Sequence, residues 1–160
     1  MKKQGFTLIE LMVVIVIMGI LAAVAVPKLF GMIAKSKASE VGPAAGTYVK
    51  LQEAYAAEKN AVGAFADVGY KAPGSSGVTG VFNYNGAASV AGKWQAESLV
   101  GLNDCQKGSK WFLEISYDES TGNLTTTAGS DDKTNCITPL TPNFCNLASA
   151  GDAGCTKTSL

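Results

Sequence analysis

A long apolar run near the N-terminus constrains the fold of this chain more than any other feature. The sixteen residues from Leu11 to Val26 carry no charge, and Glu10 is the only charged residue among the twenty-one from Phe6 to Val26. As an α-helix the longer run would measure about 31 Å, which matches the hydrocarbon core of a bilayer. The run is apolar on all sides, which disfavours a helix that packs one face on a soluble core. We therefore expect a membrane-spanning helix.

The run by itself leaves three interpretations open. A secretory signal peptide would use Lys2-Lys3 as its basic region and Ala23-Val24-Ala25 as its cleavage site. A plain single-span anchor would place Glu10 near the membrane interface, and a buried helix of a soluble protein is the third interpretation. Each must account for Glu10, because a charge inside a bilayer costs about 2.5 to 3.5 kcal/mol on insertion scales.

The residues around Glu10 form a recognisable pattern, KKQGFTLIELMVV, from Lys2 to Val14. A basic leader precedes Gly5, an aromatic residue follows at Phe6, and Glu10 lies four residues further on. This pattern resembles the class III signal of type IV pilins and related filament subunits. The resemblance implies that a prepilin peptidase cleaves between Gly5 and Phe6 on the cytoplasmic face, that Phe6 is then N-methylated, and that the apolar stretch stays attached.

Cleavage before Phe6 would compensate the charge of Glu10. The new α-ammonium group of Phe6 would lie one helical turn from the Glu10 carboxylate, and pairing the two would offset much of the cost of burying either. The resemblance implies that this assembly charge pair joins Glu10 of one subunit to Phe6 of its neighbour. A simpler role is also open, because an acidic residue in the first turn of a helix interacts favourably with the helix dipole.

The resemblance also implies a function. We expect a structural subunit of a type IV pilus, stored in the bacterial inner membrane with its head in the periplasm and then assembled into an extracellular filament used for adhesion, motility or DNA uptake. The implied partners are further copies of the chain, the prepilin peptidase, the inner membrane and an assembly machinery with an ATPase motor. Two alternatives are a pseudopilin of a type II secretion system and a secreted or membrane-anchored binding domain with a conventional signal sequence.

Composition indicates that the chain is not an enzyme. It contains no histidine, no Gly-rich phosphate loop and no nucleophile elbow, and its 13 basic and 13 acidic residues give no net charge. Clustered Lys and Arg are absent, so no nucleic-acid partner is predicted, and no cofactor or metal site is expected. The acidic pairs Asp118-Glu119 and Asp131-Asp132 are interpreted as solvated turn residues, although the second pair leaves calcium binding conceivable.

Beyond the apolar run the pattern predicts a second, amphipathic helix. Its apolar stripe recurs at spacings of seven, three, four and seven residues, and charged residues occupy the other side. We expect Gly42-Pro43 to bend this helix. Pro27 inside the first helix is expected to kink it, and the resemblance implies that the segment from Gly19 to Pro27 partly unwinds in a filament. The stripe consists of Val41, Tyr48, Leu51, Tyr55 and Val62.

The rest of the chain predicts an α+β fold with a small antiparallel sheet of three or four strands, covered by the amphipathic helix. The clearest strand is KWFLEISY at 110–117, with others at 81–84, 93–100 and 124–127. We expect a leader over 1–5, a transmembrane or filament-core helix over 6–33, and a globular head over 34–160. Within the head we expect the amphipathic helix over 34–60, a loop over 61–80, the sheet over 81–128 and a disulfide-bounded C-terminal region over 129–160.

Four cysteines in the last third of the chain indicate two disulfides in an oxidising compartment. The sequence alone allows three pairings. We favour Cys105–Cys136 with Cys145–Cys155, because sequential pairing closes the fewest crossing loops. From Ala128 onward we see no periodicity and expect the disulfides, rather than burial, to hold the chain in place.

Overall fold

The structure is a computed structural model that describes residues 5–151, 155 and 156. The chain divides into two compact units, Met1–Ile33, which we call the stem, and Ala34–Leu160, which we call the head. Of the leader predicted over 1–5, only Gly5 lies within the described residues. The predicted fold class is confirmed, with a long bent N-terminal helix, four antiparallel strands in one sheet and two disulfides near the C-terminus; a short fifth strand was not predicted.

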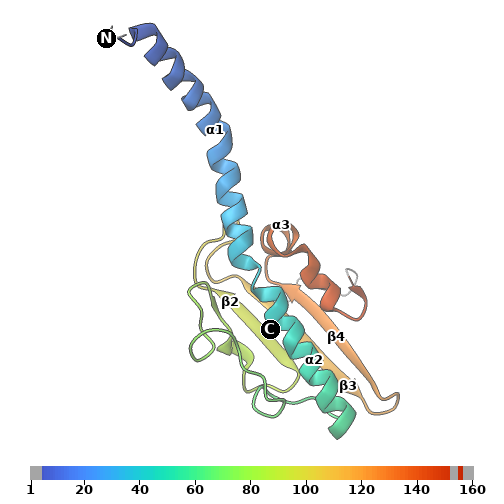
Figure 1. Ribbon diagram of the computed structural model, residues 1–160. Coiled ribbons are helices and arrows are strands. Elements are labelled where there is room, and N and C mark those ends of the chain that lie inside the picture. The colour runs from blue at the N-terminus through green and yellow to red at the C-terminus, as the bar shows by residue number, and fades with distance from the viewer. Residues whose placement is uncertain (1–4, 152–154, 157–160) are drawn as a thin grey trace. The chain divides into compact units, whose positions relative to one another are not determined.

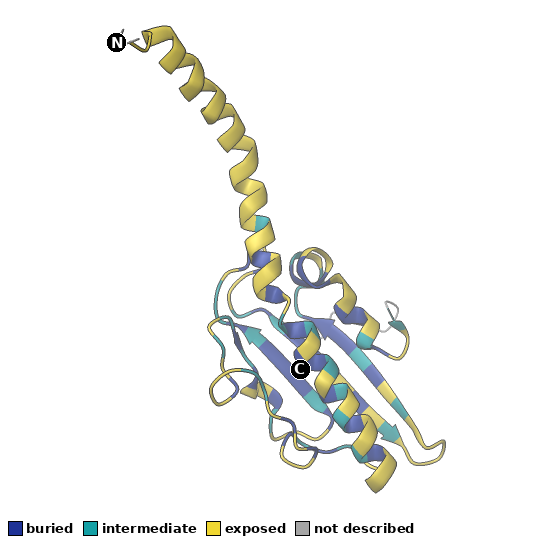
Figure 2. Ribbon diagram, in the orientation of Figure 1, coloured by how far each residue is buried: buried dark blue, intermediate teal, exposed yellow. Residues whose placement is uncertain are grey.

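Helix α1 (Leu8–Ala38) contains the whole described apolar run except its first residues. It is long and apolar enough to cross a membrane, and its stem residues are exposed almost throughout (Figure 2). The helix continues through both Gly19 and Pro27 without interruption. The expected unwinding of this segment in a filament therefore stays a prediction.

The bend in the helical segment lies between α1 and α2 (Val41–Lys59), at Ser39 and Glu40. The bend was expected at Gly42-Pro43, so it occurs three residues earlier than predicted. Pro43 has no backbone N–H to donate to the carbonyl of Ser39, and its ring crowds that carbonyl. The ladder therefore breaks before Pro43, which is tolerated inside the first turn of α2, where N–H groups lack helical partners in any case.

The sheet of the head has the order β1-β2-β3-β4-β5, and α2 crosses one of its faces (Figure 1). Neighbouring strands β1 to β4 are antiparallel, whereas the short β5 lies parallel to β4 at the edge. Trp94 and Trp111 are fully buried between the sheet and the elements that cover it. The strands are β1 (Phe82–Asn83), β2 (Lys93–Ser98), β3 (Lys110–Asp118), β4 (Asn123–Ser130) and β5 (Cys155–Thr156).

Helix α2 buries one side against the sheet and exposes the other (Figure 2). Val41 and Tyr48 of the predicted stripe are fully buried, while Leu51 and Tyr55 are half-buried at its margin. Gln52 is also fully buried on this side, although its polar side chain gave no reason to place it in the core.

Gln52 is accommodated because it binds the loop that follows α2. Its Oε1 accepts the backbone N–H of Gly63 at 3.0 Å, and its Nε2 donates to the carbonyl of Gly63 and to the hydroxyl of Tyr48 at 2.6 Å. Nearby, the Tyr70 hydroxyl donates to the carbonyl of Ala44 and accepts from the indole N–H of Trp94. A buried polar group is tolerated only when its hydrogen bonds are satisfied, so these contacts fix the loop on the helix.

The C-terminal region corrects the expectation that burial would not order it. Strand β4 continues to Ser130, and three short helical turns follow it: η2 (Lys133–Ile137), α3 (Thr138–Leu140) and η3 (Pro142–Leu147). Apolar side chains from each turn are buried, namely Ile137, Leu140 and Phe144. These turns have π, α and 3₁₀ geometry in succession, so no single hydrophobic period runs through them.

Two disulfides fasten this region to the head. Cys105 joins Cys136 across a separation of 31 residues, and Cys145 joins Cys155 across 10 residues. The first ties η2 to the loop between β2 and β3. The second ties η3 to the short β5 at the sheet edge. Burial and cross-linking therefore act together on a segment that has little regular structure.

Replacing Gln52 with Leu should destabilise the head strongly. Gln52→Leu leaves the N–H of Gly63 buried without a partner, at a cost of roughly 1 to 3 kcal/mol, whereas the Gly63 carbonyl keeps the N–H of Gly92 as a donor. We expect the free energy of unfolding to fall by about 1 to 3 kcal/mol, measured by tryptophan fluorescence in urea on the full chain in detergent. Gln106→Leu, at an exposed glutamine, is the matched control, and equal effects of the two substitutions would refute a special role for Gln52.

The buried tyrosines should make the head sensitive to alkali. Burial raises the pKa of Tyr48 to about 12, and burial also raises the pKa of Tyr70. Folding thus favours the protonated form of these tyrosines. Their contribution to the free energy of unfolding is complete below the unfolded pKa near 10 and is lost as pH rises toward 12. Tyr48→Phe should make the decline in unfolding free energy between pH 10 and 12 shallower by on the order of 1 to 2 kcal/mol. Parallel curves for the two proteins would contradict this assignment.

Candidate functional site

The residues of the predicted cleavage and assembly motif lie at the start of α1. Thr7 precedes the first helical residue and acts as its N-cap, because its Oγ1 accepts the backbone N–H of Glu10 at 3.3 Å. In return the Glu10 carboxylate accepts the backbone N–H of Thr7 at 2.8 Å and the Thr7 hydroxyl proton. This reciprocal arrangement is a capping box, in which a threonine and a glutamate three residues later satisfy each other's backbone donors.

The capping box gives Glu10 a partner inside its own chain. The spacing Thr7-x-x-Glu10 is a sequence signal for such a cap, in addition to the dipole interaction expected for Glu10. Phe6 is 80% exposed, and its nitrogen belongs to a peptide bond while Gly5 is attached. The charge pair between Phe6 and Glu10 therefore stays a prediction for the cleaved chain.

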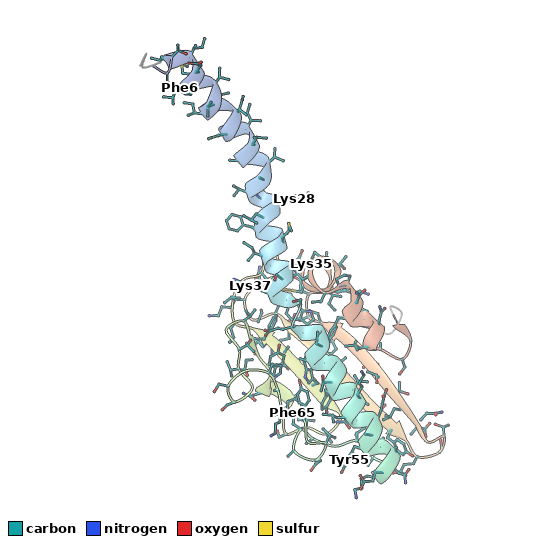
Figure 3. All side chains as sticks on the ribbon, in the orientation of Figure 1. Phe6, Lys28, Lys35, Lys37, Tyr55 and Phe65 are labelled. Atoms are coloured by element: carbon teal, nitrogen blue, oxygen red, sulfur yellow. A yellow bond between two sulfur atoms is a disulfide. The ribbon has the colours of Figure 1, made fainter. Side chains whose placement is uncertain are left out.

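Glu10 also lies within an apolar patch of the stem. The side chains of Ile9, Val13 and Val14 border it together with Phe6, and side chains project from every side of α1 (Figure 3). A carboxylate surrounded by exposed apolar groups would be desolvated if another apolar surface covered the patch. Such a cover would strengthen the attraction of Glu10 for any cation that the covering surface carried.

The two acidic pairs of the head lie in turns; Asp118 and Glu119 are exposed, whereas Asp131 and Asp132 are half-buried instead of solvated. The Asp118 carboxylate accepts the hydroxyl of Ser120 at 2.6 Å and its backbone N–H at 2.9 Å, and these bonds lower the pKa of Asp118. Asp131 accepts the backbone N–H of Lys110, and Asp132 accepts both the backbone and the side-chain N–H of Asn135. Within residues 5–151, 155 and 156, no group of three or more His, Cys, Asp or Glu side chains could hold a metal ion.

Comparison with known proteins identifies the N-terminal segment. Residues 1–26 match the model of the prokaryotic N-terminal methylation motif. The N-terminus of this chain therefore carries a prokaryotic N-terminal methylation motif. The match contains Gly5, Phe6, Thr7 and Glu10, the residues that the sequence analysis and the structure single out.

Type IV pilins are also found among the relatives of the chain. It is 41% identical over 66 residues to the type IV major pilin protein PilA of Myxococcus xanthus, which is 41% of this chain and 30% of that protein. It is 56% identical over 39 residues to a type IV major fimbrial protein FimA of Dichelobacter nodosus, which is 24% of this chain and 25% of that protein. The alignments thus span about a quarter to a third of the length of these relatives.

The capping box can be tested through its hydroxyl group. Thr7→Val keeps the shape of the side chain but removes the acceptor of the Glu10 N–H, a loss that typically costs about 1 kcal/mol of helix stability. We expect amide hydrogen exchange at Glu10 to become roughly fivefold faster, measured by NMR on the detergent-solubilised chain. Thr7→Ser retains the hydroxyl and should exchange at close to the original rate. Fast exchange in both variants would show that the hydroxyl is not the cap.

Proposed function

We propose that the chain is a structural subunit of a type IV pilus and polymerises through α1. The observation that carries this proposal is the exposed apolar surface of the stem, preceded by the methylation motif. The surface needs either lipid or other protein around it. The relatives are named as pilins and fimbrial proteins, which are structural proteins rather than enzymes.

The stem suits a subunit that is stored in a membrane and later assembled. In the membrane its side chains would contact lipid tails, and in a filament they would contact neighbouring stems. Both surroundings are apolar, so the hydrophobic effect changes little between them, and packing and polar contacts decide which state is favoured. An assembly machinery with an ATPase motor would supply the work of extracting the subunit.

Glu10 is the polar group that gives neighbouring stems a register. After cleavage before Phe6, the ammonium group of one subunit would approach Glu10 of the next, in surroundings where a charge pair is screened little. A misplaced neighbour would leave both charges buried without partners. The pair therefore favours one axial position over its alternatives.

The disulfides support an orientation for the stored subunit. Disulfides persist in oxidising compartments such as the bacterial periplasm, so the head would lie on that side of the inner membrane. The N-terminus would then face the cytoplasm, where the prepilin peptidase acts. Assembly would carry the head to the cell surface as part of the extracellular filament, where adhesion, motility or DNA uptake would follow.

Mass spectrometry of sheared surface fibres tests this function directly. We expect the chain to be a fibre component, with Phe6 as its first residue and one added methyl group of about 14 Da on the α-nitrogen. A mature terminus near Val26 would instead indicate a conventional secretory signal. Fibres that lack the chain altogether would refute the proposal.

Two substitutions of Glu10 separate its charge from its role as a cap. Glu10→Gln keeps an acceptor for the Thr7 N–H, since glutamine also serves in capping boxes, but it removes the charge. Glu10→Ala removes both. We expect fibre yield to fall at least tenfold in both variants, measured by immunoblot of the sheared fraction relative to the subunit in the membrane. Normal yield with Glu10→Gln and loss with Glu10→Ala would assign assembly to the cap and overturn the charge pair.

A further inference from the structure

The surface of the head has a groove. It has a volume of about 390 Å³ and lies beside the start of α2, where α3 and η3 run alongside the helix (Figure 1). All its lining residues belong to the head. One wall runs from Lys35 of α1 through the turn at Ser39 to Gly42 of α2. The other wall is mainly apolar and includes Leu140, Phe144 and Leu147.

The groove exists because two glycines on α2 have different neighbours. A Cβ atom added at Gly46 would lie 3.8 Å from Cδ2 of Leu147, so η3 packs directly on the helix at that turn. A Cβ atom added one turn earlier, at Gly42, would meet no other group within 4 Å. The two walls are therefore in contact at Gly46 and separate at Gly42, where the missing side chain leaves the space open.

An apolar groove of this size favours an apolar occupant. Among the described residues, nearly all the large apolar side chains that remain exposed belong to the stem; the two in the head are Val78 and Val90. The volume lies within the range of about 300 to 1,000 Å³ that is usual for binding pockets, and so has room for side chains from adjacent turns of a helix. The chain itself thus supplies a matching surface.

We propose that this groove receives apolar side chains from the stem of a neighbouring copy of the chain. The proposal rests on the pilus function and deepens it by naming the surface of the head that contacts the next subunit. The groove and the stem are different surfaces of one chain, so their pairing between copies is head to tail. Such a contact repeats along an open filament instead of closing a symmetric dimer.

Cross-linking in intact fibres tests the contact. Asn143 lines the groove and is exposed, so it is a suitable position for a cysteine. Three double variants would each combine Asn143→Cys with one substitution in the stem: Leu21→Cys, Val24→Cys or Leu29→Cys. A short bis-maleimide should give covalent dimers with at least one stem position on a non-reducing gel. Glu119→Cys, in the turn between β3 and β4, is the control and should give at least fivefold less dimer with the same stem positions.

Filling the groove tests whether assembly needs it. Gly42→Leu places a side chain into open space, so the urea midpoint of the detergent-solubilised chain should be unchanged or higher. We expect fibre yield to fall at least tenfold while the subunit remains in the membrane. Gly80→Leu is the matched control, since a Cβ atom at Gly80 also meets nothing within 4 Å, and it should assemble normally.

The results distinguish failure of this inference from failure of the proposed function. If fibres contain the wild-type chain, but Gly42→Leu assembles at the wild-type level and Asn143→Cys links to no stem position, the groove has another role and the pilus function stands. Cross-links that form only within one copy would also overturn the proposal. So would a thiol at position 143 that is blocked in membranes but free in fibres, because lipid would then be the occupant of the groove. Wild-type fibres that lack the chain would remove the pilus function itself.

Discussion

The exposed apolar surface of α1 is the constraint on which the rest of this molecule depends. A helix with such side chains on every face cannot remain in water, and it cannot bury itself on its own head, because a soluble core covers only one face of a helix. The chain is therefore incomplete as an isolated molecule. Under the proposed pilus function, a membrane would surround the stem before assembly and other stems would surround it afterwards.

The head would meet a different demand under the proposed function, since it would have to stay folded while its surroundings change from the membrane surface to a filament. It does so with links that do not depend on neighbours. Gln52 ties the loop after α2 to the helix through Gly63, and the two disulfides hold the irregular C-terminal turns. Each link lies within the head, so its stability is independent of where the stem is.

How much of this could be read from the sequence depended on the range of each interaction. The apolar run and the alternating strand at 110–117 were evident because their patterns are local, and β1 to β4 were found where expected. The capping box of Thr7 and Glu10 has an equally local signal, the spacing Thr7-x-x-Glu10. Gln52 could not be placed, because its partner Gly63 is brought to it by the tertiary fold.

The groove illustrates a further limit of sequence analysis. Gly42 was interpreted together with Pro43 as a bend, whereas the structure assigns the break to the lost donor of Pro43 and leaves Gly42 as an open position on the helix. A glycine that permits a turn and one that leaves space for a partner look the same in one sequence. The structure separates these two kinds of glycine through the contrast with Gly46, where Leu147 of η3 occupies the space beside the helix.

Glu10 joins these observations, because its observed role as a cap and its proposed role in assembly would compete for one carboxylate. In the uncleaved chain the carboxylate already accepts two hydrogen bonds from Thr7, so it does not wait unpaired for a neighbour. The proposed ammonium group of a neighbour would therefore have to add to those bonds or replace them, and the net gain would be smaller than that of a bare ion pair. A moderate gain at each subunit suits a filament that is built from a membrane store, since the charge then selects the register while the packing of many apolar side chains supplies the strength.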